Sequence, residues 1–253
     1  TADMVEHWGL LKFETFLVLW IALAVLLGLY QIGILGWKGA KGRPGIGRAV
    51  VGLASLAFAV YMGMGLVRHE SLSLLSGLAP PVHYSYKADH TPKTGGHDSN
   101  IGCPHGLDCF HDFDLALAEA KRQDKPLFVD FTGHGCVNCR KMEENVWDKP
   151  GIIEHLRDNF VVVSLYVDDK ERLFPEDKFA YLLDPNTGDK IRTVGDKWSQ
   201  FQVNNFQVSS QPYYVLMHHD GTTLLNQPRA YTPNVGEYQA FLDCGFNAFK
   251  RVK

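Results

Sequence analysis

The sequence predicts an α/β domain, with helices on both faces of a mixed sheet, preceded by two transmembrane α-helices. Two long uncharged apolar runs near the start predict the membrane helices, because about 20 apolar residues are needed to cross the hydrocarbon core. From about residue 109 onward, helical patterns alternate with short apolar strands, which is typical of an α/β domain. The chain has 253 residues and a net charge of -3, so its composition gives no reason to expect a nucleic-acid partner.

The predicted membrane segment covers residues 1–68, with spans at about 16–36 and 49–67. Two buried helices of a soluble core are the alternative, but such helices rarely run so far without a charge. Neither run is a secretory signal, because Asp3 and Glu6 stand where a basic region is needed. The chain begins at Thr1 rather than Met, which suggests a fragment of a longer protein.

The loop between the two spans predicts their orientation. It is basic and has no acid, with its charges on Lys38, Lys41, Arg43 and Arg48. Because basic loops stay in the cytoplasm, we expect both ends of the chain to lie outside it. Residues 69–108 follow as a predicted flexible linker, rich in turn-forming residues and without an apolar period.

The domain at 109–253 begins with a predicted helix, "DFDLALAEAKRQ", that places Phe113, Leu117 and Ala120 on one face, with Asp112 or Asp114 as its cap. The strand "PLFVDF" follows, then the cysteine pair and a helical stretch toward Trp147. Another helix, "GIIEHLRDNF", leads into "VVVSLYV", an apolar strand typical of burial on both faces.

The last third of the domain starts with a predicted polar insertion at about 168–206. The stretch "PYYVLMHHDGTTLLNQ" then predicts a hairpin that turns at Asp220 and Gly221. The chain closes on an amphipathic helix at 234–251, whose expected inward residues are Val235, Tyr238, Phe241, Leu242 and Phe249.

Cys136 and Cys139 carry the main functional signal, in the stretch "FTGHGCVNCRKMEE". Haem attachment requires a His after the second cysteine, and Arg140 stands there instead. A structural zinc site usually needs a second ligand pair. The only other cluster is "CPHGLDCFH", whose Cys103, His105, Cys109 and His111 could in principle hold a metal, but their spacing matches no familiar zinc pattern.

A redox-active disulfide is the favoured interpretation of the pair. Cys136 follows a buried strand and opens a helix, where backbone N–H groups and the helix dipole stabilise a thiolate. Cys136 is then the attacking sulfur, and Cys139, one turn later, resolves the mixed disulfide. Gly133 and Gly135 leave the approach to Cys136 open to another protein. No metal and no cofactor beyond this dithiol are expected.

The segment "KPLFVDFTGHGCVNCRKMEENVW" resembles the active-site segment of the C-terminal thioredoxin-like domain in the thiol:disulfide interchange protein DsbD family. The two apolar runs resemble the end of the transmembrane domain of that family. The resemblance implies a thioredoxin-like fold, and it implies roles for single residues. Asp130 matches a buried acid that manages the proton of the second cysteine, and Glu143 matches a second acid near the thiols, although a water-facing side chain is the alternative for each.

The same resemblance places a substrate-binding surface at Gln211, Pro212 and Gly135. Pro212 matches a cis-proline opposite the cysteines, and a cis bond there presents the backbone of Gln211 to a substrate strand. Some positions depart from the family pattern. His134 and Gly135 stand where relatives often have an acid and an aromatic residue.

Three cysteines also lie outside the family pattern. Cys103 and Cys109 are expected to form a structural disulfide, because thiols oxidise outside the cytoplasm. Cys244 is expected in the core, on the buried face of the last helix.

The resemblance implies a protein-disulfide reductase of the bacterial inner membrane, with its thioredoxin-like domain in the periplasm. Electrons from cytoplasmic thioredoxin would arrive through an upstream transmembrane redox domain, since the spans here hold no cysteine. The expected clients are oxidised thiol proteins of the disulfide-isomerase or cytochrome c maturation type. Two alternatives stay open: another tethered thioredoxin-like enzyme, either an oxidant or a cytochrome-maturation reductase, and a non-enzymatic metal-binding module.

Overall fold

The computed structural model describes residues 8, 10–35, 45–82, 84–86, 103–174 and 182–252. The chain divides into two compact units, one formed by Leu10–Ala88 and the other mainly by Asp89–Lys253. The two units are described separately below.

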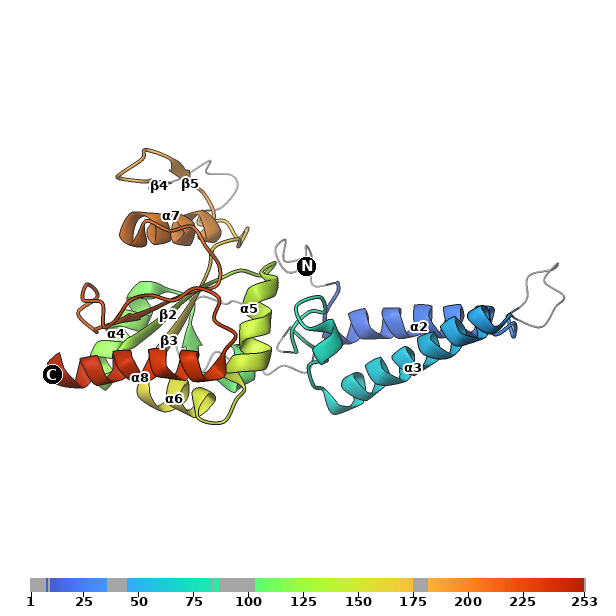
Figure 1. The fold of residues 1–253 in the computed structure, drawn as a ribbon. Coiled ribbons are helices and arrows are strands. Elements are labelled where there is room, and N and C mark those ends of the chain that lie inside the picture. Colours follow the sequence, from blue (N-terminus) through green and yellow to red (C-terminus); the bar gives the residue numbers. More distant parts are fainter. Residues whose placement is uncertain are drawn as a thin grey trace. The chain divides into compact units, whose positions relative to one another are not determined.

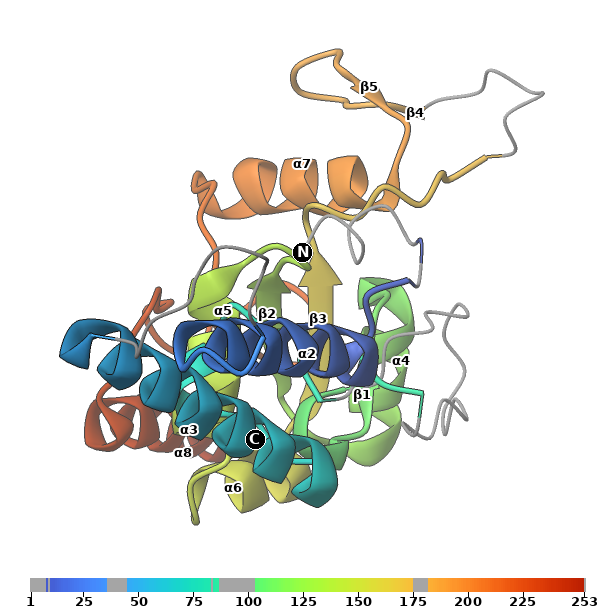
Figure 2. The same cartoon turned by 90° about the vertical axis from the view of Figure 1, so that its right-hand side faces the viewer.

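The first unit contains two apolar helices, α2 (Phe13–Gln31) and α3 (Ile46–Arg68). They run side by side, as Figures 1 and 2 show from two directions. Both are long and apolar enough to cross a membrane, with mean hydropathies of 2.1 and 2.0. Their backbones approach closely at Gly28 and Gly52, where a Cβ on either glycine would lie 3.1 Å from the carbonyl oxygen of the other.

The helix limits differ from the predicted spans. Helix α2 starts three residues earlier than predicted and ends at Gln31, because the chain turns at Ile32 and at Gly33, which has a φ of 83°. Helix α3 begins at Ile46, three residues before the predicted span, and therefore includes Arg48. The guanidinium of Arg48 donates to the side chain of Gln31 at 3.3 Å. The charge of Arg48 therefore does not limit helix α3, because a long basic side chain can reach a polar group while its backbone stays helical.

The predicted linker also begins later than expected. Residues 69–82 and 84–86 pack back on the two helices, with a short 3₁₀ turn, η1 (Ser73–Leu75). Leu72 and Leu75 contact the buried cluster around Phe13, and the amide of Phe13 donates to the carbonyl of Tyr84 at 3.0 Å. These contacts come from isolated leucines, which leave no apolar period in the sequence. Residues 87–102 of the predicted linker lie outside the described residues.

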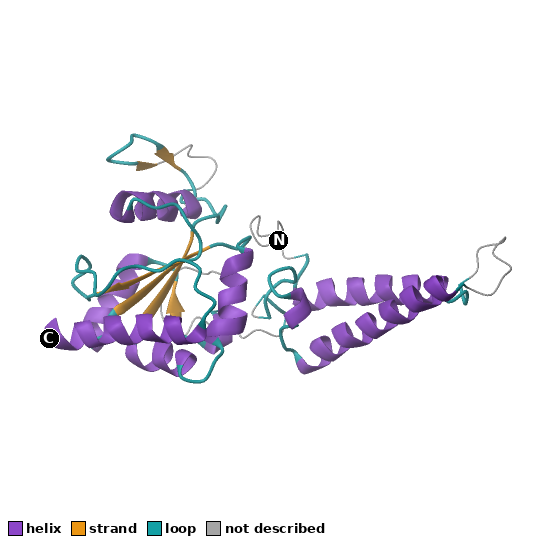
Figure 3. Ribbon diagram, viewed as in Figure 1, coloured by secondary structure: helices purple, strands orange, loops and turns teal. Residues whose placement is uncertain are grey.

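The second unit is the predicted α/β domain, and its sheet has the order β1-β3-β2-β6. β1 and β2 both pair parallel with β3, whereas β6 pairs antiparallel with β2, so the sheet is mixed. Figure 3 shows these strands between helices. The elements in chain order are η2 (Pro104–Gly106), β1 (Cys109–Phe110), α4 (Phe113–Gln123), β2 (Leu127–Thr132), α5 (Val137–Met142), the π-helical turn η3 (Glu143–Trp147), α6 (Ile152–Asn159), β3 (Val161–Tyr166), β4 (Leu182–Leu183), β5 (Lys190–Ile191), α7 (Val194–Phe206), β6 (Tyr213–Met217) and α8 (Val235–Val252).

Helices cover both faces of this sheet, as the sequence predicts. One core cluster packs the sheet against α5, η3, α6 and α8, and the other packs it against α4 and α7. Strand β2 is buried along its whole length, and its side chains alternate between the clusters. Phe128 therefore faces the cluster that contains α5, and so does Asp130, two residues later, whereas Val129 and Phe131 face α4 and α7.

Three details of the domain refine the sequence analysis. The predicted polar insertion contains the helix α7, which a capping box at Thr193 and Asp196 starts. The predicted hairpin is present, because β6 bridges a return segment and Asp220 accepts the amide of Thr223 at 2.8 Å across the turn. The prediction that Cys244 is buried was wrong: it is exposed, because the inward face of α8 carries Leu242 and its neighbours in the helical repeat.

Candidate active site

Cys136 and Cys139 lie at the start of α5 and are joined by a disulfide, with their Cα atoms 5.3 Å apart. Cys136 is the residue that caps the helix, and the amide of Cys139 donates to its sulfur at 3.1 Å. Cys136 is partly exposed, whereas Cys139 is only 1% exposed. A partner disulfide can therefore approach Cys136, and the backbone N–H stabilises negative charge on that sulfur.

The loop ahead of Cys136 is held by the carboxylate of Asp168, which follows β3. This carboxylate accepts the amide of His134 at 2.7 Å and the amide of Gly135 at 2.8 Å. The loop also comes so close that a Cβ on Gly133 would lie 2.9 Å from the carboxylate. Glycine at position 133 therefore allows Asp168 to reach the two amides.

A shallow hollow of about 410 Å³ opens at the disulfide. The peptide bond between Gln211 and Pro212 is cis, as expected from the sequence, and Gln211 lies at the rim of this hollow. Residues far apart in the chain thus share one concave surface. Its lining consists of Gly133, Gly135, Cys136, Val137, Asn138, Asp168 and Gln211.

Asp130 is buried in the central strand β2, between Ser164 on β3 and Tyr214 on β6. It is 2% exposed, and burial raises its pKa to about 7 against the opposing effect of the Arg140 guanidinium. The hydroxyl of Ser164 donates to one carboxyl oxygen at 3.3 Å. Among the described residues the other oxygen, Oδ1, has no hydrogen-bond partner. Asp130 is therefore a buried acid that can gain or lose a proton near neutral pH.

Glu143 is the second predicted acid, and it is also buried rather than facing water. It is 4% exposed, and burial raises its pKa to about 8 although Arg140 lies beside it. The guanidinium of Arg140 contacts its carboxylate at 2.7 Å and donates to Thr132 at 3.2 Å. The structure thus brings Asp130, Glu143 and Arg140 into one buried group, although the roles of the two acids in proton transfer stay predictions.

Sequence reasoning missed several members of this group. Arg140 served only to exclude haem, although a basic residue next to a buried cysteine was a usable signal. His134 is 2% exposed, stacks on Tyr166 with ring centroids 4.1 Å apart and contacts the carboxylate of Asp169 at 3.2 Å. Burial raises the pKa of Tyr166. No local pattern marks Tyr166, because an aromatic residue in a buried strand is expected to be an ordinary core residue.

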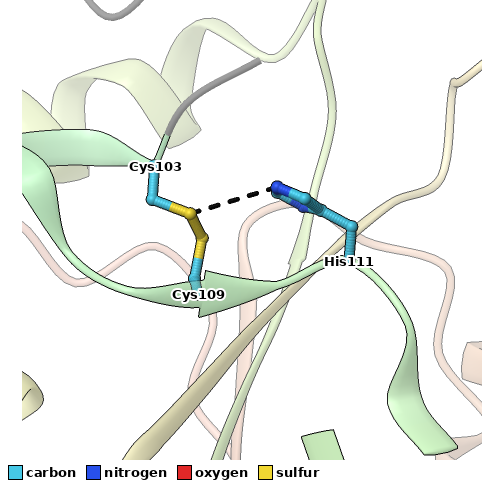
Figure 4. Close-up of side chains that lie close together, drawn as sticks. All are labelled: Cys103, Cys109 and His111. Carbon is cyan, nitrogen blue, oxygen red and sulfur yellow. Dashed lines mark hydrogen bonds between the residues drawn. A yellow bond between two sulfur atoms is a disulfide. The ribbon is translucent and has the colours of Figure 1, made fainter. Parts of the chain in front are cut away.

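A second sulfur pair lies on the same side of the sheet, at the edge strand β1. Cys103 and Cys109 are joined by a disulfide, with Cα atoms 6.0 Å apart, and both pack against the core cluster of α5, α6 and α8. Figure 4 shows His111 with its Nε2 directed at the sulfur of Cys103, 4.0 Å away. His105 is not part of this group, because its Nε2 donates to the carbonyl of Glu143 at 2.7 Å.

Comparison with known families identifies the domain that contains Cys136 and Cys139. Residues 113–243, more than half of the chain, match the family model described as "Thioredoxin-like domain". One curated relative is the "Thiol:disulfide interchange protein DsbD 1" of Pseudomonas aeruginosa, 30% identical over 105 residues. That match covers 41% of this chain and 16% of the relative, so the chain spans only a small part of the relative's length.

Three solved structures are also similar to this chain. The "DsbH Oxidoreductase" is 15% identical with a TM-score of 0.40, and the alignment covers 56% of this chain and 85% of the other. A thioredoxin from Thermus thermophilus is 20% identical with a TM-score of 0.37, covering 53% and 84%. A disulphide isomerase from Xylella fastidiosa Temecula1 is 20% identical with a TM-score of 0.28, covering 55% and 86%.

Proposed function

Because the chain belongs to the thioredoxin-like family of disulfide oxidoreductases, we propose that it is a membrane-anchored protein-disulfide reductase of the DsbD type. Its substrates are thiol proteins, and it uses no cofactor other than the Cys136–Cys139 dithiol. The difference in exposure between the two sulfurs carries the proposal, because a partner can reach Cys136 while Cys139 stays buried.

The reaction transfers two electrons to a client disulfide. The thiolate of Cys136 attacks one client sulfur, and the other client sulfur leaves and takes up a proton. Cys139 then loses its proton and attacks the sulfur of Cys136, which releases the second client thiol and forms the Cys136–Cys139 disulfide. Asp130 is the proposed acceptor of the Cys139 proton, because its raised pKa lets it exchange a proton near neutral pH. We assign Gln211 and Gly135, in the hollow beside Cys136, to binding of the client backbone.

Regeneration of the dithiol needs a source of electrons outside this chain segment. The two apolar helices hold no cysteine, so we propose an upstream transmembrane redox domain, supplied by cytoplasmic thioredoxin. The basic loop between the helices supports a location in the bacterial inner membrane with the domain in the periplasm. Oxidised proteins of the disulfide-isomerase or cytochrome c maturation type are the proposed clients.

The reduction potential of the full chain in detergent micelles tests the direction of electron flow. We expect one two-electron couple at Cys136–Cys139 between about -270 and -200 mV, absent from Cys136→Ser and from Cys139→Ser. Cys139→Ser should also accumulate mixed disulfides with clients, whereas Cys244→Ser, a matched control on the exposed face of α8, should behave as the wild type. A potential near about -120 mV would make the chain an oxidant, and no couple would refute the redox function.

The exposed thiol of Cys244 also reports the orientation. A membrane-impermeant maleimide added to intact spheroplasts should modify Cys244 in a Cys136→Ser/Cys139→Ser background, which lacks the reactive dithiol, and should not modify the same background that also carries Cys244→Ser. Modification that requires lysis of the spheroplasts would place the domain in the cytoplasm and contradict the proposed location.

A further inference from the structure

Cys103, Cys109 and His111 lie outside the proposed reductase site, and their donor atoms lie within 4.8 Å of one another. We propose that these three residues form a binding site for a soft divalent cation of the zinc class, which fills only when the Cys103–Cys109 disulfide is reduced. The reductase function does not require this site, and the site does not require Cys136 or Cys139.

The first argument is the tautomer of His111. Its Nδ1 lies 3.1 Å from the carbonyl oxygen of Ser164, and a carbonyl can only accept, so Nδ1 carries the proton. In the neutral ring Nε2 then presents its lone pair, and Nε2 is the atom that faces the sulfur of Cys103. A backbone carbonyl on the far ring nitrogen is the usual way in which proteins orient a metal-binding histidine.

The second argument is distance. In a tetrahedral zinc site, bond lengths of about 2.3 Å to sulfur and 2.05 Å to nitrogen place these two donors about 3.6 Å apart. Nε2 of His111 lies 4.0 Å from the sulfur of Cys103, so the ring needs to move by only a few tenths of an ångström. Two thiolate sulfurs on zinc lie about 3.8 Å apart, so the two sulfurs have to separate, which the disulfide prevents.

The third argument is charge. Reduction takes two electrons and two protons from a dithiol of the thioredoxin class and yields two thiols at Cys103 and Cys109. Binding of M²⁺ then releases both protons to solvent and leaves two thiolates, one neutral imidazole and one dication, with no net charge. This neutrality suits a place where all three residues are partly buried. The partial exposure leaves room for water as a fourth ligand.

A cation at this site would also stabilise the loop between Cys103 and Cys109, which the disulfide closes. Within that loop, the ring of His105 donates to the carbonyl of Glu143, at the start of η3. Without a cation, reduction removes the covalent closure of this loop. A bound cation restores the closure and so keeps the contact between the loop and the element that follows the active-site helix.

The test uses the full chain in detergent micelles, in a Cys136→Ser/Cys139→Ser/Cys244→Ser background, so that the only remaining thiols are those of the proposed site. After reduction and removal of the reductant, Co²⁺ should bind one equivalent and give thiolate-to-metal charge-transfer and tetrahedral d–d bands. Zn²⁺ should displace it. The oxidised protein should give no such spectrum.

Two further variants make the test specific. Cys103→Ser should abolish the charge-transfer spectrum. His111→Gln should weaken Zn²⁺ affinity by at least about 100-fold, because loss of even a hydrogen-bond partner of a metal ligand lowers metal affinity by about 10- to 100-fold. His105→Gln, in the same loop but outside the site, is the matched control and should bind as the background protein does. Folding of each substitution is checked in the otherwise wild-type chain by the couple of its Cys136–Cys139 pair.

Three outcomes would overturn the proposal. They are a Cys103–Cys109 bond that dithiothreitol does not reduce in the folded chain, a reduced protein that binds no Co²⁺, and binding that is unaffected by His111→Gln. Because the test protein lacks Cys136 and Cys139, none of these outcomes bears on the reductase function.

Discussion

Replacement of Asp130 by Asn should stabilise the domain at neutral and alkaline pH but not in acid. The folded protein holds a proton on this buried carboxyl up to a pKa of about 7, whereas the unfolded chain releases it above about 3.8. Between these two values the unfolded state binds fewer protons than the folded state. The free energy of unfolding of the wild type therefore falls as the pH rises from about 4 to about 7. Asn carries no such proton and removes this dependence.

The size of the effect follows from the two pKa values. Their difference of about three corresponds to about 4 kcal/mol, since each pKa unit is worth about 1.4 kcal/mol. The stability of Asp130→Asn relative to the wild type should thus rise by about 2 kcal/mol near pH 5.5 and level off at about 4 kcal/mol above pH 7. This is a large fraction of the 5–15 kcal/mol that is typical of a folded domain.

Urea unfolding of the oxidised full chain in non-ionic detergent, at a series of pH values from 4 to 8.5, measures this difference. The fluorescence of buried Trp147, which donates to the hydroxyl of Tyr238 at 3.0 Å, reports unfolding of the domain. Asp158→Asn, the same chemical change at an exposed position of α6, is the control and should give a difference that does not vary with pH. A flat difference for Asp130→Asn would refute the reasoning, because Asp130 would then be ionised in the folded protein.

Three further predictions concern Arg140, Asp168 and the free thiol of Cys244. Arg140→Leu should lower the free energy of unfolding by about 1–3 kcal/mol at pH 8, because the buried side chains of Glu143 and Thr132 lose their guanidinium donor, as urea unfolding would show. Asp168→Ala should lower the free energy of unfolding by about 1–3 kcal/mol in the same assay, because two amides ahead of Cys136 lose their acceptor, and it should slow insulin reduction. Without reductant, a thiol reagent should titrate one cysteine per folded chain and none in Cys244→Ser, since the other four are in disulfides.

Each of these predictions has an outcome that contradicts it. Equal stability of Arg140→Leu and the wild type at pH 8 would mean that the guanidinium of Arg140 does not stabilise the buried side chains of Glu143 and Thr132. Unchanged insulin reduction by Asp168→Ala would show that the loop does not need this carboxylate. Asp168→Asn should have a smaller effect than Asp168→Ala, since its single amide oxygen can still accept one of the two donors. A second thiol that titrates in the folded chain would show that one of the disulfides is open.

The sequence alone predicted the elements with strong local signals. Continuous β-rich runs identified β2 and β3, and the candidate caps Asp112 and Asp114 identified the start of α4, which Asp112 caps. The helix α7 was missed because its apolar residues are spread through a polar segment. Cys244 was misplaced because Gly245, packed against Leu216, lies on the inward face of α8, and periodicity rarely marks a glycine as core.

The sequence by itself determined the chemistry of the site, because two cysteines at the start of a helix after a buried strand carry that information locally. The resemblance named Asp130 and Glu143 as acids near the thiols, but the sequence left open whether each is buried or faces water. Burial of Glu143 beside Arg140, and the raised pKa values that follow, arise only when helix, turn and sheet pack together. Likewise Gln211 meets Cys136 only in the folded domain, and His111 faces Cys103 only because Ser164 of the neighbouring strand orients its ring. Local sequence determines which titratable and metal-binding side chains lie near one another along the chain. Their protonation and their partners depend on desolvation and on contacts between distant segments.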